Sequence, residues 1–410
     1  MSTELPCEER ALDGAAASDR WPSHPFVLLE DRHGGETLCF ARCHQVLEAH
    51  SYDAVPATLA AMLEAQSAGY FLAGYAAYEL GYMFEPRLAP LAPALSGPLL
   101  QFGVFDEPRR FDWAEVRGSA GISSFSPLWT FDAYAARFRQ VIDYIRAGDV
   151  YQVNLTFPLI GAWSGDPIAL FAALRSRQPA PYGGVVSLGS ETILSLSPEL
   201  FFEREGSLIR TRPMKGTAPR GMSPEDDHHF AVSLVTSEKN RAENLMIVDL
   251  LRNDLGRVSE IGSVRVTDLF SVETYPTLFQ MTSGVEAQLR PGLQLPDLLQ
   301  ALFPCGSITG APKIRAMEVI RELEARPRGV YCGSIGMLNP NGEARFNVAI
   351  RTLTLSPSGQ ATFNVGSGLV FDSEARSEYD ECLLKAAFLA ECGLRAVRPC
   401  MSDIEQGEMP

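Results

Sequence analysis

The sequence lacks the short motifs that mark several large classes of enzyme. It contains no G-x-S-x-G, no H-E-x-x-H and no G-x-G-x-x-G. No motif therefore supports a serine hydrolase, a zinc peptidase or a dinucleotide-binding protein. Its eight cysteines include no C-x-x-C pair, which argues against a zinc ribbon or a dithiol redox centre. All six histidines lie before residue 230. Catalysis in the C-terminal part must therefore use carboxylates, lysine, tyrosine, thiols or a metal ion.

Positive charge is also scarce. The chain has 35 lysines and arginines against 50 acidic residues, a net charge of −15, and no basic cluster. Such a field repels phosphate backbones, so we expect no nucleic-acid partner. The most apolar long stretch, residues 88–105, is broken by prolines, and the first residues lack a signal-peptide pattern. We therefore expect no membrane association and a cytoplasmic location with reduced thiols.

The composition is that of a globular protein with ample chain for a core, since 46% of the 410 residues are hydrophobic and 21% are charged. Proline-rich and Gly/Ser-rich passages favour a boundary near residue 125, between an N-terminal subdomain, 1–125, and a catalytic region, 126–410. Helical patterns then alternate with hairpin-like strand runs rather than with regular βαβ spacing; they cover 131–147, 238–255, 312–325 and 377–392. This arrangement predicts an α+β fold with antiparallel sheets.

One predicted β-hairpin would bring a carboxylate and an amine together. Glu205-Gly206 is a two-residue turn candidate, because glycine supplies a positive φ. If Arg204 faces Ser207 across that turn, Glu199 and Lys215 lie at the same open end. In a protected pocket the glutamate would become a proton donor and the lysine a nucleophile. The alternative is a solvated ion pair at a strand end.

Two predicted helices carry further acidic groups. Glu243 lies off the apolar stripe of the 238–255 helix, and Glu381 and Lys385 share one face of the 377–392 helix. Two carboxylates from two helices suit a hard divalent ion such as Mg²⁺. A solvated acidic face fits the same spacing.

Glycine-containing segments suggest sites for an anion. Two glycines are expected to break a strand at residues 364–370, where their amides could approach an anion. A single strand over 344–355 carries Arg351, either a carboxylate clamp or an edge-strand charge. The run Gly306–Lys313 has the wrong spacing for a P-loop, and we predict a turn followed by a helix with Pro312 at its first position.

Taken in order, several segments resemble the chorismate-utilising enzymes. The resemblance covers residues 131–390, and two N-terminal segments are similar to the amino-transferring members. The matching segments are Val27–Asp31, Gly74–Leu80, Gly148–Leu155, Ser197–Glu199, Arg212–Arg220, Arg241–Leu250, Gly306–Lys313, Gly366–Gly368 and Glu381–Lys385. The resemblance implies two packed antiparallel sheets flanked by helices, with the active site in a cleft.

The resemblance also implies a role for each matched residue. Glu243 and Glu381 would hold Mg²⁺, Glu199 would be the proton donor and Lys215 the nucleophile. The implied substrate-binding residues are Gln152, Gly216, Thr217, Ser307, Tyr331, Arg351, Gly366, Ser367, Gly368 and Lys385.

Two positions bear on the reaction. Anthranilate-forming members usually have alanine where this chain has Lys215, and isochorismate-forming members have a water-activating lysine where it has Gln152. This favours addition of ammonia to chorismate with the pyruvyl group retained, giving 4-amino-4-deoxychorismate for p-aminobenzoate and folate. The alternatives are an anthranilate-forming enzyme and, in another class, a non-catalytic binding protein of the same fold.

One departure from the family pattern is Gln280, which stands where many relatives have histidine. Glutamine can hydrogen-bond but cannot shuttle protons near neutral pH. The sequence also has no glutaminase nucleophile motif. The resemblance therefore implies a heterodimer with a separate glutamine amidotransferase subunit that supplies the ammonia.

Overall fold

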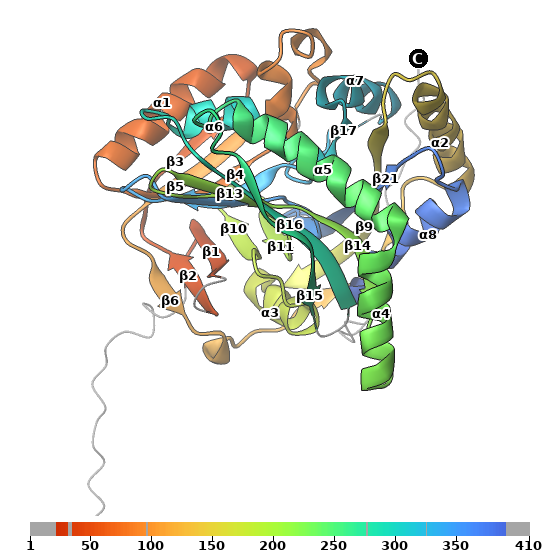
Figure 1. Ribbon diagram of the computed structural model, residues 1–410. Helices are drawn as coiled ribbons and strands as arrows, with labels where there is room; N and C mark the ends of the chain where they lie inside the picture. The colour runs from red at the N-terminus through yellow and green to blue at the C-terminus, as the bar shows by residue number, and fades with distance from the viewer. Residues whose placement is uncertain (1–21, 32–34, 96, 276–277, 325, 391–410) are drawn as a thin grey trace, which may run out of the picture.

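Two large antiparallel sheets form the framework of the computed structural model, which describes residues 22–31, 35–95, 97–275, 278–324 and 326–390 (Figure 1). The path of the eleven-stranded sheet is β17 (Gly310–Ala311), β9 (Gln152–Gly165), β21 (Gln360–Leu369), β20 (Thr352–Leu355), β11 (Thr192–Ser195), β10 (Gly184–Ser187), β1 (Phe26–Asp31), β2 (Glu36–Phe40) and β6 (Arg109–Phe111). Two short strands, β7 (Ala120–Ile122) and β8 (Ser126–Pro127), also pair with β9.

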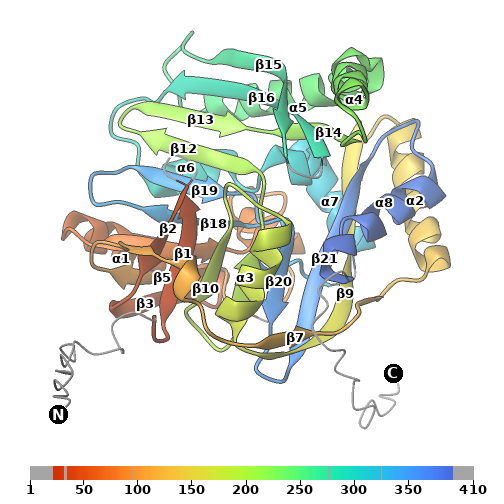
Figure 2. The same ribbon diagram turned by 90° about the horizontal axis from the view of Figure 1, so that it is seen from below.

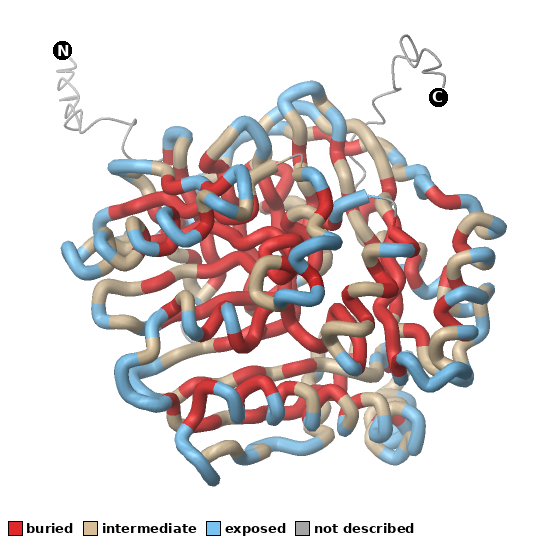
Figure 3. Tube along the Cα trace, turned by 90° about the horizontal axis from the view of Figure 1, so that it is seen from above, coloured by how far each residue is buried: buried red, intermediate tan, exposed pale blue. Residues whose placement is uncertain are grey.

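The second sheet has ten strands. Its path is β14 (Met214–Pro219), β16 (Leu278–Gln288), β13 (Leu208–Arg212), β12 (Leu200–Glu205), β19 (Ala344–Asn347), β18 (Ser334–Leu338), β4 (Phe71–Ala76), β5 (Leu100–Phe105) and β3 (Cys43–Ala49), with β15 (Arg265–Thr274) beside β16. Apolar side chains between the sheets are buried, and Figure 3 shows the buried segments through the middle of the molecule. The predicted α+β fold of two packed antiparallel sheets is confirmed.

Helices cover the outer surfaces of the sheets. They are α1 (Val55–Ser67), α2 (Phe131–Arg146), α3 (Pro167–Arg177), α4 (Pro224–Thr236), α5 (Glu238–Gly256), α6 (Leu295–Leu302), α7 (Lys313–Leu323), α8 (Ala375–Leu384) and α9 (Ala387–Ala390). In Figure 2, α2 and α8 lie beside β9 and β21, and α4 and α5 lie along β14–β16. No described helix is long and apolar enough to cross a membrane.

Local sequence explains how two of these helices begin and which faces they bury. In α2, the Thr130 side chain accepts a hydrogen bond from the Ala133 amide, and Tyr134, Phe138 and Val141 recur on the buried face. In α5, the Ser237 hydroxyl accepts from the Asn240 amide and caps the first turn. The buried residues of α5 lie on one face of the helix, and Glu243 lies beside that face and is only partly buried.

The N-terminal part of the chain contributes to both sheets. In one sheet β1 pairs with β10, placing Phe26 opposite Ser187. In the other, β4 pairs with β18, placing Ala76 opposite Ser334. The strands before residue 112 therefore extend the same sheets that the later residues build.

Three predicted strand details differ in the structure. The run 344–355 is two strands in different sheets, because the chain turns at Ile350 and Arg351 has a φ of +50°. The glycines in 364–370 do not break β21, which pairs without interruption with β9. The predicted hairpin forms, but its two-residue turn is Gly206-Ser207 rather than Glu205-Gly206, because Glu205 still pairs with Leu208 and Arg204 with Ile209; a bulge lies nearer the start of β12, between Leu200 and Glu203.

Helix ends also shift relative to the predictions. Pro312 is the N-cap of α7 rather than its first residue, and its extended backbone starts the helix one residue later. The predicted 377–392 helix is α8 followed by α9, with Lys385 as the C-cap of α8. Its last two residues, 391–392, and the end of the predicted 312–325 helix, residue 325, lie outside the described residues.

Candidate active site

Glu199 lies at the start of β12 with only 3% of its surface exposed. Its backbone is fixed, since its carbonyl accepts from the Val348 amide at 3.0 Å and its amide donates to the Ser197 hydroxyl at 3.3 Å. Side-chain oxygen Oε1 is buried and has no hydrogen-bond partner among the described residues. Burial raises the pKa of Glu199 to about 7, although Ser307 and Lys215 act to lower it. Near neutral pH this carboxyl group can therefore hold a proton and donate it.

Lys215 on β14 reaches the same region. Burial lowers the pKa of its amine, while the charges of Glu199, Glu243 and Glu381 act in the opposite direction. A Cβ built on Gly368 of β21 would lie 3.3 Å from Lys215 Nζ and 2.8 Å from Gln152 Nε2. The structure therefore brings the lysine amine, the Gln152 amide and the Gly368 backbone to one point. A lowered pKa increases the unprotonated fraction that a nucleophile needs.

Gln152 is 1% exposed, yet its Nε2 has no hydrogen-bond partner in the described part of the chain. A buried amide is normally satisfied, so an orphaned donor beside Lys215 indicates a place for a ligand acceptor. The absence of a Cβ on Gly368 leaves the space that these two side chains occupy. The glycine is therefore needed here for close approach.

Gln280 holds the backbone immediately after Lys215. It lies on β16 opposite Thr217 of β14 and is 5% exposed. Its Nε2 donates to the Gly216 carbonyl at 2.8 Å, and its Oε1 accepts from the Thr217 hydroxyl at 3.1 Å. Gly216 has a φ of +81°, a conformation that glycine adopts without strain. The side-chain amide of Gln280 thus fixes this turn. The sequence analysis did not predict this role, and the only sign of it was a glutamine where many relatives have histidine.

Acidic groups from two helices face this region. Lys385 Nζ is 2.8 Å from Glu381 Oε1 and donates to the Gly366 carbonyl at 2.8 Å, which ties α8 to β21. Burial raises the pKa of Glu243, and the negative charges of Glu378 and Glu381 act in the same direction. Burial acts to raise the pKa of Glu381 too, but Lys385 outweighs it and holds that pKa low. Sequence reasoning did not assign Glu378 to the site.

The two carboxylates fit Mg²⁺ by the chemistry of their donors. No group of three or more His, Cys, Asp and Glu residues forms a metal cage in the described residues. Mg²⁺ needs no such cage, because it commonly binds one or two carboxylates and keeps positions for water and substrate oxygens. Side chains of Glu243 and Glu381 are 24% and 55% exposed, so both retain access to solvent.

Arg351 lies at the crossover between the sheets. It lines a small pocket with Tyr275, Gln280 and Pro198. Its charge also acts to lower the pKa of Glu199, which places the guanidinium within electrostatic range of the carboxyl group. A cation in this position can pair with a substrate carboxylate.

Three other predicted substrate-binding residues, Ser307, Tyr331 and Ser367, have fewer contacts with the groups described above. Ser307 is buried and its hydroxyl acts on the pKa of Glu199. Tyr331 is 5% exposed, and burial raises the pKa of its hydroxyl while the charge of Arg328 acts to lower it. The Ser367 hydroxyl lies beside the Cys382 thiol of α8, because it alternates with the glycines across β21.

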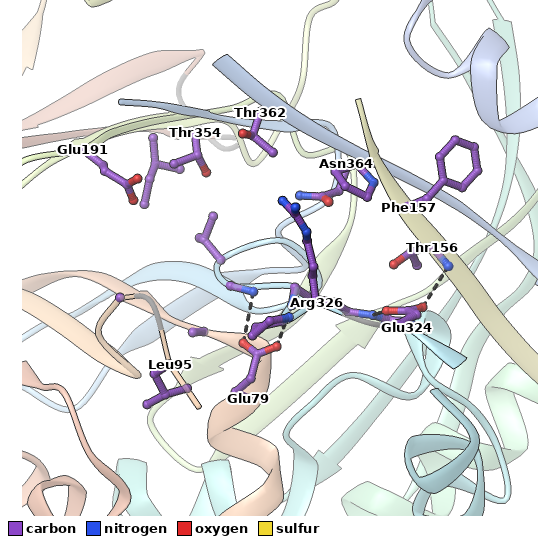
Figure 4. Close-up of a pocket in the computed structure, with 18 of the residues that line it drawn as sticks. Glu79, Leu95, Thr156, Phe157, Glu191, Glu324, Arg326, Thr354, Thr362 and Asn364 are labelled. Atoms are coloured by element: carbon purple, nitrogen blue, oxygen red, sulfur yellow. Dashed lines mark hydrogen bonds and ion pairs between the residues drawn. The ribbon is translucent and has the colours of Figure 1, made fainter. Parts of the chain in front are cut away.

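A larger cavity, with a volume of about 470 Å³, lies elsewhere between the sheets. Figure 4 shows Glu79, Glu324 and Arg326 on one side of it and Glu191, Thr354 and Thr362 on another. None of the predicted site residues lines it. The buried ion pair of Arg328 and Glu324, at 2.7 Å, forms part of its wall.

Comparisons with known proteins identify the family. The family described as "chorismate binding enzyme" matches residues 113–391. "Aminodeoxychorismate synthase component 1" of Escherichia coli (strain K12) is 48% identical over 259 residues, which are 63% of this chain and 57% of that one. The protein of the same name from Klebsiella aerogenes is 40% identical over 333 residues, 75% of this chain and 74% of that one. The chain thus spans little more than half of the length of the first of these relatives.

A solved structure has the same fold. The crystal structure of anthranilate synthase component I from Streptococcus pneumoniae TIGR4 aligns with a TM-score of 0.71 at 25% identity, covering 93% of this chain and 94% of that one. The family match, the relatives and the fold all agree. The chain belongs to the family of chorismate binding enzymes.

Proposed function

We propose that this chain converts chorismate and ammonia to 4-amino-4-deoxychorismate. The observation that carries the proposal is Lys215, whose amine lies beside Gln152 and Gly368 and whose pKa is lowered by burial. The anthranilate-forming alternative has no use for a nucleophilic lysine at this position. Relatives named aminodeoxychorismate synthase component 1 support the same reaction.

The proposed reaction replaces a ring hydroxyl by an amine in two steps. Glu199 donates its proton to the departing hydroxyl, which leaves as water, while the unprotonated amine of Lys215 forms a C–N bond to the ring. Ammonia then forms a bond to the carbon that lost the hydroxyl, and Lys215 leaves with the electron pair of its bond. The pyruvyl group stays on the ring throughout.

Binding groups surround these two residues in the proposed complex. Arg351 pairs with a substrate carboxylate, and the unpartnered Nε2 of Gln152 donates a hydrogen bond to the substrate. Glu243 and Glu381 would hold Mg²⁺, which would neutralise and orient the ring carboxylate of an anionic substrate.

We propose further that ammonia comes from a glutamine amidotransferase subunit. The sequence has no glutaminase nucleophile motif. The relatives carry the name "component 1", which supports a partner component. Purified alone, the chain should turn over chorismate with ammonium salt and not with glutamine.

Product analysis tests the proposal. Chorismate, Mg²⁺ and ammonium salt should give 4-amino-4-deoxychorismate by mass spectrometry. Anthranilate with released pyruvate as the main product would identify the anthranilate-forming alternative. No turnover with any nucleophile, but binding of chorismate, would identify a non-catalytic binding protein.

Covalent trapping tests the role of Lys215 itself. Without ammonia, enzyme, Mg²⁺ and chorismate should give an adduct with the mass of chorismate less water. The chain has four lysines, so peptide mapping can assign the adduct to Lys215. Lys215→Ala should abolish the adduct, and the exposed Lys239 of α5 should carry no adduct in the wild-type peptide map. Wild-type product formation by Lys215→Ala would refute the nucleophile.

A further inference from the structure

A buried pair of polar side chains lies beside the proposed proton donor. Cys305 and Ser307 flank Gly306 at the start of a short 3₁₀ helix, η6 (Gly306–Ile308), and are 3% and 4% exposed. The Cys305 thiol and the Ser307 hydroxyl are 3.3 Å apart, which is a hydrogen-bond distance for sulfur. The Ser307 hydroxyl in turn acts as a hydrogen-bonding group on Glu199. The three side chains therefore form one line that ends at the carboxyl group.

The backbone that carries this pair is held on two sides. The Thr309 hydroxyl donates to the carbonyls of Cys305 and Gly306 at 3.2 and 3.1 Å. A Cβ built on Gly306 would lie 2.4 Å from Leu250 Cδ2, so η6 packs closely against α5. The positions of the thiol and the hydroxyl are therefore fixed by the backbone. What remains to be set is the direction in which each of them donates its proton.

The two oxygens of the Glu199 carboxyl group have different surroundings. Oε1 is buried and has no hydrogen-bond partner in the part of the chain that the structure describes. The Ser307 hydroxyl and the Met214 amide, which both act on the carboxyl group, are therefore assigned to Oε2. Donors directed at Oε2 disfavour a proton on that oxygen. A proton on Oε1, in contrast, is free to be donated to a substrate.

The direction of the Ser307 hydroxyl decides whether Oε2 keeps this donor. A hydroxyl group has a single proton, so Ser307 can donate either to the Cys305 sulfur or to Oε2. If the thiol donates to the Ser307 oxygen, the Ser307 proton is left for Oε2. Burial and the charge of Glu199 raise the pKa of the Cys305 thiol to about 12. The thiol therefore keeps its proton at neutral pH and is able to donate it.

We propose that Cys305 is a positioning residue for proton transfer. Its thiol donates to the Ser307 oxygen, the Ser307 hydroxyl donates to Oε2 of Glu199, and the transferable proton is thereby held on Oε1. Cys305 touches no reacting atom and acts only through Ser307. The proposal rests on the proposed function, because it takes Glu199 as the proton donor.

Substitutions at Cys305 separate hydrogen bonding from packing. Cys305→Ala and Cys305→Val both remove the donor and bracket the size of the side chain, whereas Cys305→Ser keeps a donor. Both donor-free variants should lower kcat roughly tenfold with little change in KM, because a misplaced proton affects the chemical step and not substrate binding. Cys305→Ser should recover most of this loss. A cysteine that only fills space would give the opposite order, since a buried serine is the more disruptive change.

Another buried thiol provides the matched control. Cys39 of β2 is 1% exposed and pairs with Leu28 of β1. Cys39→Ala removes the same atoms from the protein interior at a position outside the proposed site. It should leave kcat and its pH dependence unchanged.

The pH profile is a readout that a change in packing alone would not move. Burial raises the pKa of Glu199, while Ser307, Lys215 of β14 and Arg351 at the crossover act to lower it. Lys215 and Arg351 are present in every variant. Without the thiol, Ser307 donates less to the carboxylate, so the pKa of Glu199 should rise. The loss of activity at alkaline pH should therefore shift upward by about half a pH unit in Cys305→Ala and return to its wild-type position in Cys305→Ser.

Unfolding experiments test the same contact without turnover. Urea unfolding of wild type and Cys305→Ala, each with and without Glu199→Gln, gives the coupling between the two residues at each pH. Below pH 4.5 the acid is neutral in the native and the unfolded chain, so the coupling should not vary with pH there. A higher native pKa prolongs the loss of stability as pH rises. Cys305→Ala should therefore lose more stability than wild type between pH 7 and 8, and only when Glu199 is present.

Three results would overturn the proposal. The first is a wild-type kcat and pH profile for Cys305→Ala and Cys305→Val. The second is that Cys305→Ser is no more active than these two variants. The third is a coupling between Cys305 and Glu199 that stays constant from pH 5 to 8. A wild-type chain that makes no 4-amino-4-deoxychorismate would instead refute the proposed reaction, and the unfolding cycle would still decide whether Cys305 acts on Glu199.

Discussion

Replacing Glu199 by glutamine should remove activity and, at neutral to alkaline pH, stabilise the fold. The side chain is almost fully buried, and its pKa is raised from 4.5 to about 7. Glutamine has nearly the same shape and no charge. The substitution therefore removes the cost of ionising a buried carboxyl group while also removing its proton.

The stability effect follows from proton linkage. Below pH 4.5 the carboxyl group is neutral in both native and unfolded chains, so it imposes no ionisation penalty. As pH rises from 4.5 to about 7, the unfolded chain loses the proton while the native chain keeps it, and stability falls. The difference of about 2.5 pH units corresponds to roughly 3 kcal/mol at higher pH. Glu199→Gln should therefore exceed wild type in unfolding free energy by under ~1 kcal/mol at pH 5 and by ~3 kcal/mol at pH 8.

Urea unfolding followed by circular dichroism at pH 5, 6, 7 and 8 measures this difference. Glu64→Gln, on the exposed face of α1, is the control and should show no such pH dependence. Turnover by Glu199→Gln should fall by roughly 10² to 10⁴, the usual contribution of a general acid. A stability difference that stays flat from pH 5 to 8 would refute the burial argument, and wild-type turnover by the variant would refute the proton donor.

Three further substitutions probe other parts of the site. Gly368→Ala should lower turnover at least ~tenfold without changing the melting temperature much, since its Cβ would lie 2.8 Å from Gln152 Nε2 and 3.3 Å from Lys215 Nζ; wild-type kinetics would contradict that geometry. Gln280→Leu should lower kcat more than it raises KM, because it removes both hydrogen bonds that hold the turn after Lys215, and steady-state kinetics with an unchanged kcat would exclude this role. Glu381→Gln should raise the Mg²⁺ concentration for half-maximal activity and the Kd for Mn²⁺ roughly tenfold, whereas full activity in excess EDTA would remove the metal from the reaction.

The sequence predicted structure best where a short motif alone determines the local backbone conformation. Gly206 predicted the hairpin because glycine readily supplies the positive φ of such a turn, although the turn residues are Gly206 and Ser207 rather than Glu205 and Gly206. The split of 344–355 between two sheets could not be read from the run itself, because alternation of side chains says nothing about which sheet a strand joins. In the structure the change of sheet is marked by the positive φ of Arg351. Arginine has no preference for that conformation, so the sequence does not predict it.

Side-chain partners were the least predictable part of the site. The hydrogen bond that Gln280 donates to Gly216 and the one it accepts from Thr217 depend on pairing between residues more than 60 positions apart. The glycines of β21 were expected to break the strand, because glycine weakens strands on average. Instead they leave room for neighbouring groups to approach closely. A Cβ on Gly366 would lie 2.8 Å from the Leu155 carbonyl oxygen of β9.

The long-range pairing of the first strands has a consequence for synthesis of the chain. When β1 and β4 leave the ribosome, each has one partner close behind it, β2 or β5, but the strand on its other side, β10 or β18, begins only at residue 184 or 334. At roughly 5–20 residues per second, β4 waits on the order of ten seconds or more for this second partner. During that interval Leu72 and Ala73, fully buried in the finished protein, have no complete sheet to join. Chaperone capture should therefore concentrate on nascent chains shorter than about 340 residues and fall once β18 has emerged.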